Sequence, residues 1–192
     1  MELFEGIRQR IGKLILAKKV KKTRRRVYYS NIKDIRNIGI VWDANRSEDF
    51  ASLSEFHQKM HERNIDVNII GYYEGEELPA RITAIMYLSC IKRKELNFFY
   101  QPVSNDTDKF IKTIFDVLID INFEGRFPLY YISSLSAASF KVGLYDSDEK
   151  NISVFDLMME LKKPVHVENY LDQVIHYLEM INSGSSNKVE KS

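Results

Sequence analysis

The stretch FDVLIDINFEGRFPLYYISSLSAASFKVGLY, residues 115–145, decides the fold class. Its first seven residues form an almost continuous apolar run, which is typical of a strand covered on both faces in a parallel sheet. Pro128 can open a helix, because the first turn of a helix does not need the N–H group that proline lacks. Residues 140–144 predict another strand. The stretch therefore predicts one strand–helix–strand unit of an α/β domain.

A second unit of the same kind lies upstream, at residues 37–72. The segment NIGIVW, residues 37–42, predicts a strand, and an amphipathic helix follows it. The segment DVNIIGY, residues 66–72, predicts the next strand. Two such units in one chain favour an open sheet with parallel strands and helices on both faces.

The remaining segments carry weaker patterns. Residues 82–91 fit a helix or a strand, residues 96–100 predict a short strand, residues 154–161 predict an edge strand, and residues 167–181 predict a last helix. We predict a single Rossmann-like or flavodoxin-like three-layer sandwich of about five mainly parallel strands, preceded by a basic amphipathic helix. The predicted units are a helical arm (1–30), an α/β domain (37–182) and a tail that is disordered by composition (183–192).

Composition places the chain among ordinary globular proteins. Its 192 residues suffice for one domain with a sizeable core. The single cysteine, Cys90, lies among apolar residues and is expected to be a buried small side chain in a reducing compartment. No apolar run reaches the roughly 18 residues of a membrane-spanning helix. The basic start does not resemble a secretory signal, so we expect a cytoplasmic protein, with the inner membrane face as its peripheral site.

Charge is distributed unevenly along the chain. Residues 1–26 carry ten Lys or Arg against two Glu, whereas the rest of the chain carries 18 basic and 25 acidic residues. A basic arm on an acidic body predicts contact with an anionic surface. The basic residues are Arg8, Arg10, Lys13, Lys18, Lys19, Lys21, Lys22, Arg24, Arg25 and Arg26.

The same arm has apolar residues at helical spacing, which form one stripe on a helical wheel. This stripe has three possible partners: the protein's own domain, a membrane surface, or an RNA or ribosome. For RNA, the sequence TRRRVYY (23–29) would supply phosphate contacts and stacking rings. The stripe consists of Leu3, Phe4, Ile7, Ile11, Leu14 and Ile15.

Acidic residues follow the predicted strands. Asp43 ends the first strand, Asp120 lies near the end of the central strand, and Glu124 lies in the loop after it. In a parallel sheet all three come to one edge, where they could act in acid–base catalysis or bind Mg²⁺. The alternative is that they cap and solvate strand ends. We predict no cofactor, because the loop after the first strand has no glycine-rich phosphate motif.

The histidines do not predict a metal site. His57 and His61 have the i, i+4 spacing of a metal-binding pair, but the segment HQKMH lacks the glutamate of a zinc-protease motif and has no third ligand. A surface pair is the simpler interpretation.

Two resemblances add to this interpretation. The segments NIGIVWDA, FDVLIDI, DLMMEL and ENYLDQVIHYLEMI are similar to a bacterial domain-of-unknown-function family of about 170–190 residues, which implies an α/β body with a basic amphipathic start. Residues 115–145 resemble a segment of heptosyltransferase-like glycosyltransferases. The chain lacks the second domain of those enzymes and has Asp43-Ala44-Asn45 in place of their Gly-Asp turn. That resemblance implies a degenerate acceptor-type half that binds a ligand.

Together these features predict a non-enzymatic intracellular binding module. Its basic amphipathic helix, residues 1–26, would dock on an anionic membrane surface at the inner face. Its body would contact a protein partner or a small ligand that the sequence does not identify. One alternative is an RNA- or ribosome-associated protein. The other is an enzyme, or a glycosyltransferase-like half, that uses the carboxylates at the sheet edge.

Overall fold

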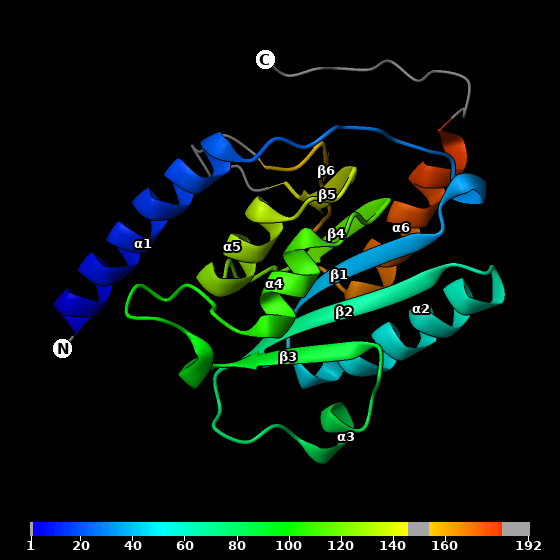
Figure 1. The fold of residues 1–192 in the computed structure, drawn as a ribbon. Helices are drawn as coiled ribbons and strands as arrows, with labels where there is room; N and C mark the ends of the chain where they lie inside the picture. Colours follow the sequence, from blue (N-terminus) through cyan, green and yellow to red (C-terminus); the bar gives the residue numbers. More distant parts are fainter. Residues whose placement is uncertain (1, 146–153, 182–192) are drawn as a thin grey trace.

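A computed structural model describes residues 2–145 and 154–181 of the chain, so the predicted tail lies outside the described residues. The described chain forms one sheet of six parallel strands in the order β3-β2-β1-β4-β5-β6 (Figure 1). The strands are β1 (Asn37–Asp43), β2 (Asp66–Tyr73), β3 (Leu88–Lys92), β4 (Val117–Ile121), β5 (Phe140–Leu144) and β6 (Leu157–Met159).

Helices cover both faces of this sheet, which gives three layers (Figure 1). Helices α2 and α6 pack on one face, and α1, α4 and α5 lie on the other. The α-helices are α1 (Glu2–Lys22), α2 (Phe50–Glu62), α3 (Ala80–Thr83), α4 (Asn105–Lys112), α5 (Phe127–Leu135) and α6 (Val167–Met180). Short 3₁₀ helices are η1 (Ile32–Asp34), η2 (Ser47–Asp49) and η3 (Arg93–Glu95).

The central strand β1 shows why the apolar runs become buried strands. Ile40 and Trp42 point into the core under α2 and α6, and Val41 between them points into the core under α5. All three side chains are fully buried. A strand that is covered on both faces needs apolar residues at successive positions, and this requirement accounts for the unbroken pattern of NIGIVW.

The α/β class, the parallel sheet and the N-terminal helix are confirmed, with six strands in place of about five. The ambiguous segment 82–91 divides between the two options, because α3 ends at Thr83 and β3 begins at Leu88. The strand predicted at residues 96–100 is wrong. That segment is a loop closed by a single bridge between Leu96 and Pro102, and Tyr100 has a positive φ of 60° that no regular strand contains.

Candidate functional site

The candidate site lies where the strand order reverses. From β1 the chain builds outward to β2 and β3, and it then returns to place β4 on the other side of β1. The connections after β1 and β4 therefore leave the sheet in opposite directions. In open α/β sheets, ligands bind at the carboxyl ends of the strands at such a switch point.

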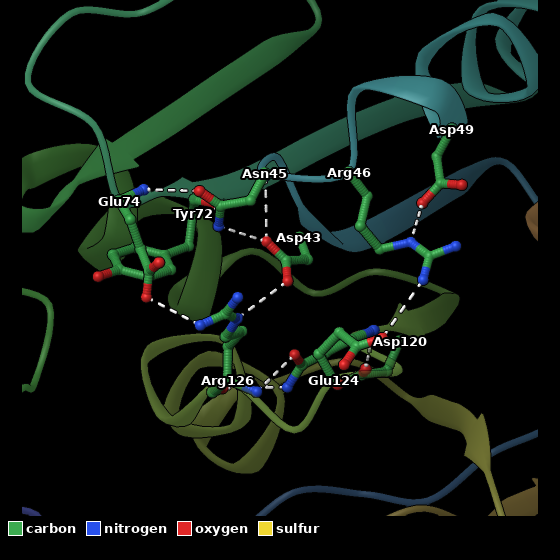
Figure 2. Close-up of polar contacts among 10 residues, drawn as sticks. Asp43, Asn45, Arg46, Asp49, Tyr72, Glu74, Asp120, Glu124 and Arg126 are labelled. Atoms are coloured by element: carbon green, nitrogen blue, oxygen red, sulfur yellow. Dashed lines mark hydrogen bonds and ion pairs between the residues drawn. The ribbon is translucent and has the colours of Figure 1, made fainter.

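Asp43 ends β1 at this switch point and is fully buried. Its Oδ1 accepts hydrogen bonds from the backbone N–H of Asn45 at 3.1 Å and from its side-chain amide at 2.6 Å. Its Oδ2 accepts a bond from Nε of Arg126 at 3.1 Å (Figure 2). Asp43 therefore closes its own turn and anchors the arginine that precedes α5.

Arg126 connects two strand ends. Its Nη1 donates to Oε1 of Glu74 at 2.8 Å, and Glu74 directly follows β2. Partial burial alone would lower the pKa of Arg126, but the hydrogen bond and the charge of Asp43, with the charge of Glu74, raise it overall. The guanidinium thus remains charged and holds the ends of β1 and β2 to the start of α5.

Asp120 is also buried, but it has different partners. Its Oδ1 accepts a hydrogen bond from the backbone N–H of Asn122 at 2.8 Å, and its Oδ2 accepts a short one from the hydroxyl of Ser133 on α5. In register, Asp120 lies beside Val41, two residues before Asp43. The two carboxylates therefore fix α5 at two separate points.

Glu124 is more than half exposed and pairs with Arg46 at 3.4 Å. Arg46 also binds Oδ2 of Asp49 at 2.8 Å through its Nε. Burial raises the pKa of Asp49, and the hydrogen bond and charge of Arg46 oppose that rise. Asp43, Asp120 and Glu124 thus reach the same edge of the sheet, as predicted, and each is engaged by its own set of neighbours (Figure 2).

Among the side chains that the structure describes, these carboxylates form no metal-binding group. Within residues 2–145 and 154–181, no three His, Cys, Asp or Glu side chains are grouped so that they could hold a metal ion. His57 and His61 stack on each other, with ring centroids 6.3 Å apart, and His57 also stacks on Tyr87 at 3.5 Å. Burial and the neighbouring His61 lower the pKa of His57.

Helix α1 is docked beside this edge by one of its faces. Gly12 packs against the backbone of Phe99, Leu16 is buried among residues of α5 and the sheet, and Nζ of Lys19 donates to the hydroxyl of Tyr131 at 2.7 Å. Arg8 donates to the carbonyl oxygen of Phe98 at 2.7 Å. These residues recur at i, i+4, i+8 and i+11, so they share one side of the helix.

The predicted apolar stripe lies to one side of this docking face of α1 and points largely to solvent. Ile7, Ile11 and Leu14 are 47%, 39% and 66% exposed, and Ile15, at the boundary, is partly buried. The side chains of Leu3 and Phe4 lie outside the described residues. The sequence predicted the stripe but not the second, buried face, because a glycine and two charged residues do most of the docking.

The ten basic residues divide into two groups. Arg8, Lys19 and Arg25 contact the domain, Arg25 through a two-pronged pair with Asp156 at 2.6 and 2.7 Å. The other seven are exposed: Arg10, Lys13, Lys18, Lys21, Lys22, Arg24 and Arg26. Lys18 and Lys21 continue the exposed face of Ile7, Ile11 and Leu14 toward the C-terminal end of α1.

Comparison with known proteins identifies the chain. The model of the family of unknown function DUF6913 matches residues 8–181. The chain belongs to this family. The match to DUF6913 spans the docking face of α1 from Arg8, the complete sheet and α6, so the larger part of α1 lies within the family unit. A search of curated proteins finds no match. The resemblance of residues 115–145 to heptosyltransferase-like enzymes stays a prediction.

Sequence reasoning missed Arg126, Glu74 and Tyr72 at the sheet edge. Glu74 had a usable signal, because it lies just after the second strand and the carboxyl ends of parallel strands meet at one edge of the sheet. Arg126 had none, because its importance comes from spanning two strand ends that are far apart in the chain.

Proposed function

We propose that this protein docks on an anionic membrane surface through the outward face of α1. The observation that carries the proposal is that Ile7, Ile11 and Leu14 are exposed on a helix that the domain already holds by another face. A helix that had only a structural role would leave polar side chains in those positions. The exposed face therefore supports an external apolar partner.

The charges around this face favour an anionic membrane as that partner. Lys18 and Lys21 extend the apolar stripe, and five further exposed Lys or Arg residues lie in the same arm. Each Lys or Arg near an anionic leaflet contributes about 1 kcal/mol, and Ile and Leu side chains add binding energy when they enter the headgroup–acyl boundary. The described residues contain no helix that is long and apolar enough to cross a bilayer.

RNA fits this surface less well. RNA phosphates would contact the basic residues, but the RNA would leave the three exposed aliphatic side chains without an apolar partner. Of the two tyrosines expected to stack on bases, Tyr29 packs against Phe140, with ring centroids 6.0 Å apart. Only Tyr28 of this pair, 47% exposed, faces outward enough to stack.

Flotation with lipid vesicles tests the proposal. We expect the full chain to float with vesicles that contain phosphatidylglycerol, to stay unbound with pure phosphatidylcholine, and to dissociate as salt is raised. Leu14→Asp should weaken binding at least tenfold, because it places a charge in the apolar face. The matched control is Ile114→Asp, since Ile114, between α4 and β4, is 67% exposed and Leu14 is 66% exposed.

A second pair of variants isolates the charges. The double variant Lys18→Glu with Lys21→Glu should abolish flotation, whereas Lys112→Glu with Lys162→Glu, which changes net charge equally at exposed positions elsewhere, should not. Equal loss in both double variants would mean that net charge alone drives association. Binding to a single-stranded RNA without any vesicle binding would overturn the membrane proposal in favour of RNA.

A further inference from the structure

A cavity of about 410 Å³ lies under α1 at the switch point. Its walls come from the start of α1, the ends of β2 and β3, and the loop that opens α5. This volume is within the range of small-molecule sites. The residues that matter for recognition are Tyr72, Glu74, Arg93, Tyr100, Glu124 and Arg126.

Tyr72 supplies a phenol hydroxyl to this cavity. It is one of the lining residues and is only 5% exposed. Burial, and then the charge of Glu74, raise its pKa, so the hydroxyl keeps its proton and can donate. The hydroxyl of Tyr72 can therefore serve as a donor to a molecule bound in the cavity.

Acidic and basic groups share the lining of the cavity. Glu5, Glu74 and Glu124 line it with about half of each side chain exposed, and Arg93 and Arg126 pair with Glu5 and Glu74 at 3.9 and 2.8 Å. Arg126 uses Nε and Nη1 for Asp43 and Glu74 and has Nη2 beside these contacts. Ionised carboxylates only accept hydrogen bonds, and guanidinium groups only donate them. A hydroxyl does both, so neighbouring hydroxyls on one ring match this arrangement.

Phosphate recognition is disfavoured at the same place. Pro128 has no N–H in the first turn of α5, and the N–H groups of Leu129 and Tyr130 both donate to the carbonyl oxygen of Arg126. The usual cradle of free backbone donors at a helix start is therefore missing from α5. Three carboxylates against two guanidinium groups would also repel a strongly anionic ligand.

We propose that this cavity binds a small uncharged polyhydroxylated ring, either a free monosaccharide or the ribose of a nucleoside. Glu74 and Arg126 hydrogen-bond neighbouring hydroxyls, Tyr72 donates from the floor, and the ring of Tyr100 offers an apolar face. This proposal stands independently of membrane docking.

Saturation-transfer NMR on the full chain, without vesicles, tests it with two sets of probes. The sugar set is glucose, galactose, mannose and ribose, and the nucleoside set is adenosine, guanosine, cytidine and uridine. We expect transfer to the ring protons of at least one probe at millimolar concentrations. Signals confined to the sugar set would assign a monosaccharide site, and signals confined to the nucleosides would assign a nucleoside site.

Three variants connect binding to the cavity. Gly6→Phe should abolish it, because Gly6 lines the cavity and a Cβ added there meets no atom within 4 Å, which leaves room for a blocking ring. Glu74→Gln and Tyr72→Phe should each weaken binding about three- to tenfold, the loss expected for one hydrogen bond. Glu55→Gln and Tyr177→Phe are the matched controls on α2 and α6 and should bind normally.

Two results would overturn the proposal: no transfer to any probe, or equal transfer in the wild type and in a folded Gly6→Phe variant. Circular dichroism establishes that each variant is folded. A loss of vesicle binding in the Leu14→Asp variant with unchanged probe binding would separate this site from the membrane surface.

Discussion

Gly12 of α1 lies so close to Phe99 that a Cβ atom added to the glycine would be 2.4 Å from the Phe99 carbonyl oxygen. Real Cβ atoms do not approach a backbone oxygen so closely, and backbone yields less easily than a side chain. The side-chain amide of Gln101 donates to the carbonyl oxygen of Gly12 at 3.3 Å on the same side. The position of α1 therefore depends on the absence of a side chain at residue 12.

Gly12→Ala should lower the free energy of unfolding by about 1–3 kcal/mol, the usual cost of forcing extra atoms into a packed contact. Helix propensity alone would change it in the opposite direction, by about 1 kcal/mol. Gly6→Ala is the matched control, since a Cβ at Gly6 meets nothing within 4 Å, and it should be neutral or stabilising. Urea unfolding measures both, and a stabilised Gly12→Ala variant would contradict the close approach.

Asp156→Asn should release the linker between α1 and β1. The Arg25–Asp156 pair is mostly buried, with 16% and 7% of the side chains exposed, and Oδ2 of Asp156 also accepts from the N–H of Lys141. Breaking such a pair costs about 3 kcal/mol, because one charge stays buried without its partner. Limited trypsin digestion should then cut at Arg24 to Arg26 faster than in the wild type.

The control for this change is the Arg63–Glu179 pair, whose side chains are 47% and 44% exposed. Glu179→Gln should alter the free energy of unfolding by less than about 1 kcal/mol, because water and salt screen exposed pairs. Similar losses in Asp156→Asn and Glu179→Gln would show that burial does not determine the strength of the inner pair.

The buried Lys141 should make stability rise with pH above neutrality. Burial, followed by the charge of Arg25, lowers the pKa of Lys141 to about 7, against an ordinary value of 10.5. Between these values the unfolded chain binds a proton that the folded chain does not, so the free energy of unfolding increases by up to about 1.4 kcal/mol per pH unit. The increase begins near pH 7 and ends near pH 10.5.

Lys141→Met should remove that slope, since methionine fills a similar volume without a titrating group. It also removes the bonds from Nζ to the carbonyl oxygens of Ser133 and Ser134, so absolute stability can fall while the slope disappears. Urea unfolding at several pH values between 7 and 10 separates the two effects. An unchanged slope in the variant would assign the pH dependence to other groups.

Cys90 should react slowly with alkylating reagents while the protein is folded. Burial, and then the charge of Glu95, raise the pKa of its thiol to about 12. At pH 8 the reactive thiolate is then about a thousandfold scarcer than for an ordinary cysteine. Mass spectrometry after iodoacetamide treatment should find Cys90 unmodified in buffer and modified in urea, and rapid labelling of folded protein would contradict this prediction.

The sheet was largely predictable, because the strands at its centre are buried on both faces. That burial demands unbroken apolar runs, and residues 37–42, 66–72 and 115–121 all contain them. The edges were harder. Strand β3 has only β2 as a neighbour, so the side chains of β3 are partly exposed and give no clear pattern. The segment 96–100 has the composition of a strand, but Tyr100 within it has a positive φ.

The positions of the acidic residues in the candidate site were predictable, but their hydrogen-bond partners were not. Asp43 and Asp120 could be placed at one edge from chain order alone, since parallel strands end together. Their separate partners, Arg126 and Ser133, depend on how α5 crosses the sheet, and spacing in sequence carries no information on that crossing. The docking face of α1 was missed for a similar reason. A glycine in the middle of a helix indicates only a lower helix propensity, and it does not reveal that another segment packs against it.

The docking of α1 also constrains the order of events during synthesis. Lys19 and its partner Tyr131 are 112 residues apart, and Arg25 and Asp156 are 131 residues apart. Helix α1 and its linker therefore meet these partners only after most of the sheet has been translated. Until then the docking face of the nascent α1 is open to the surroundings as well as the face for which we propose an anionic partner.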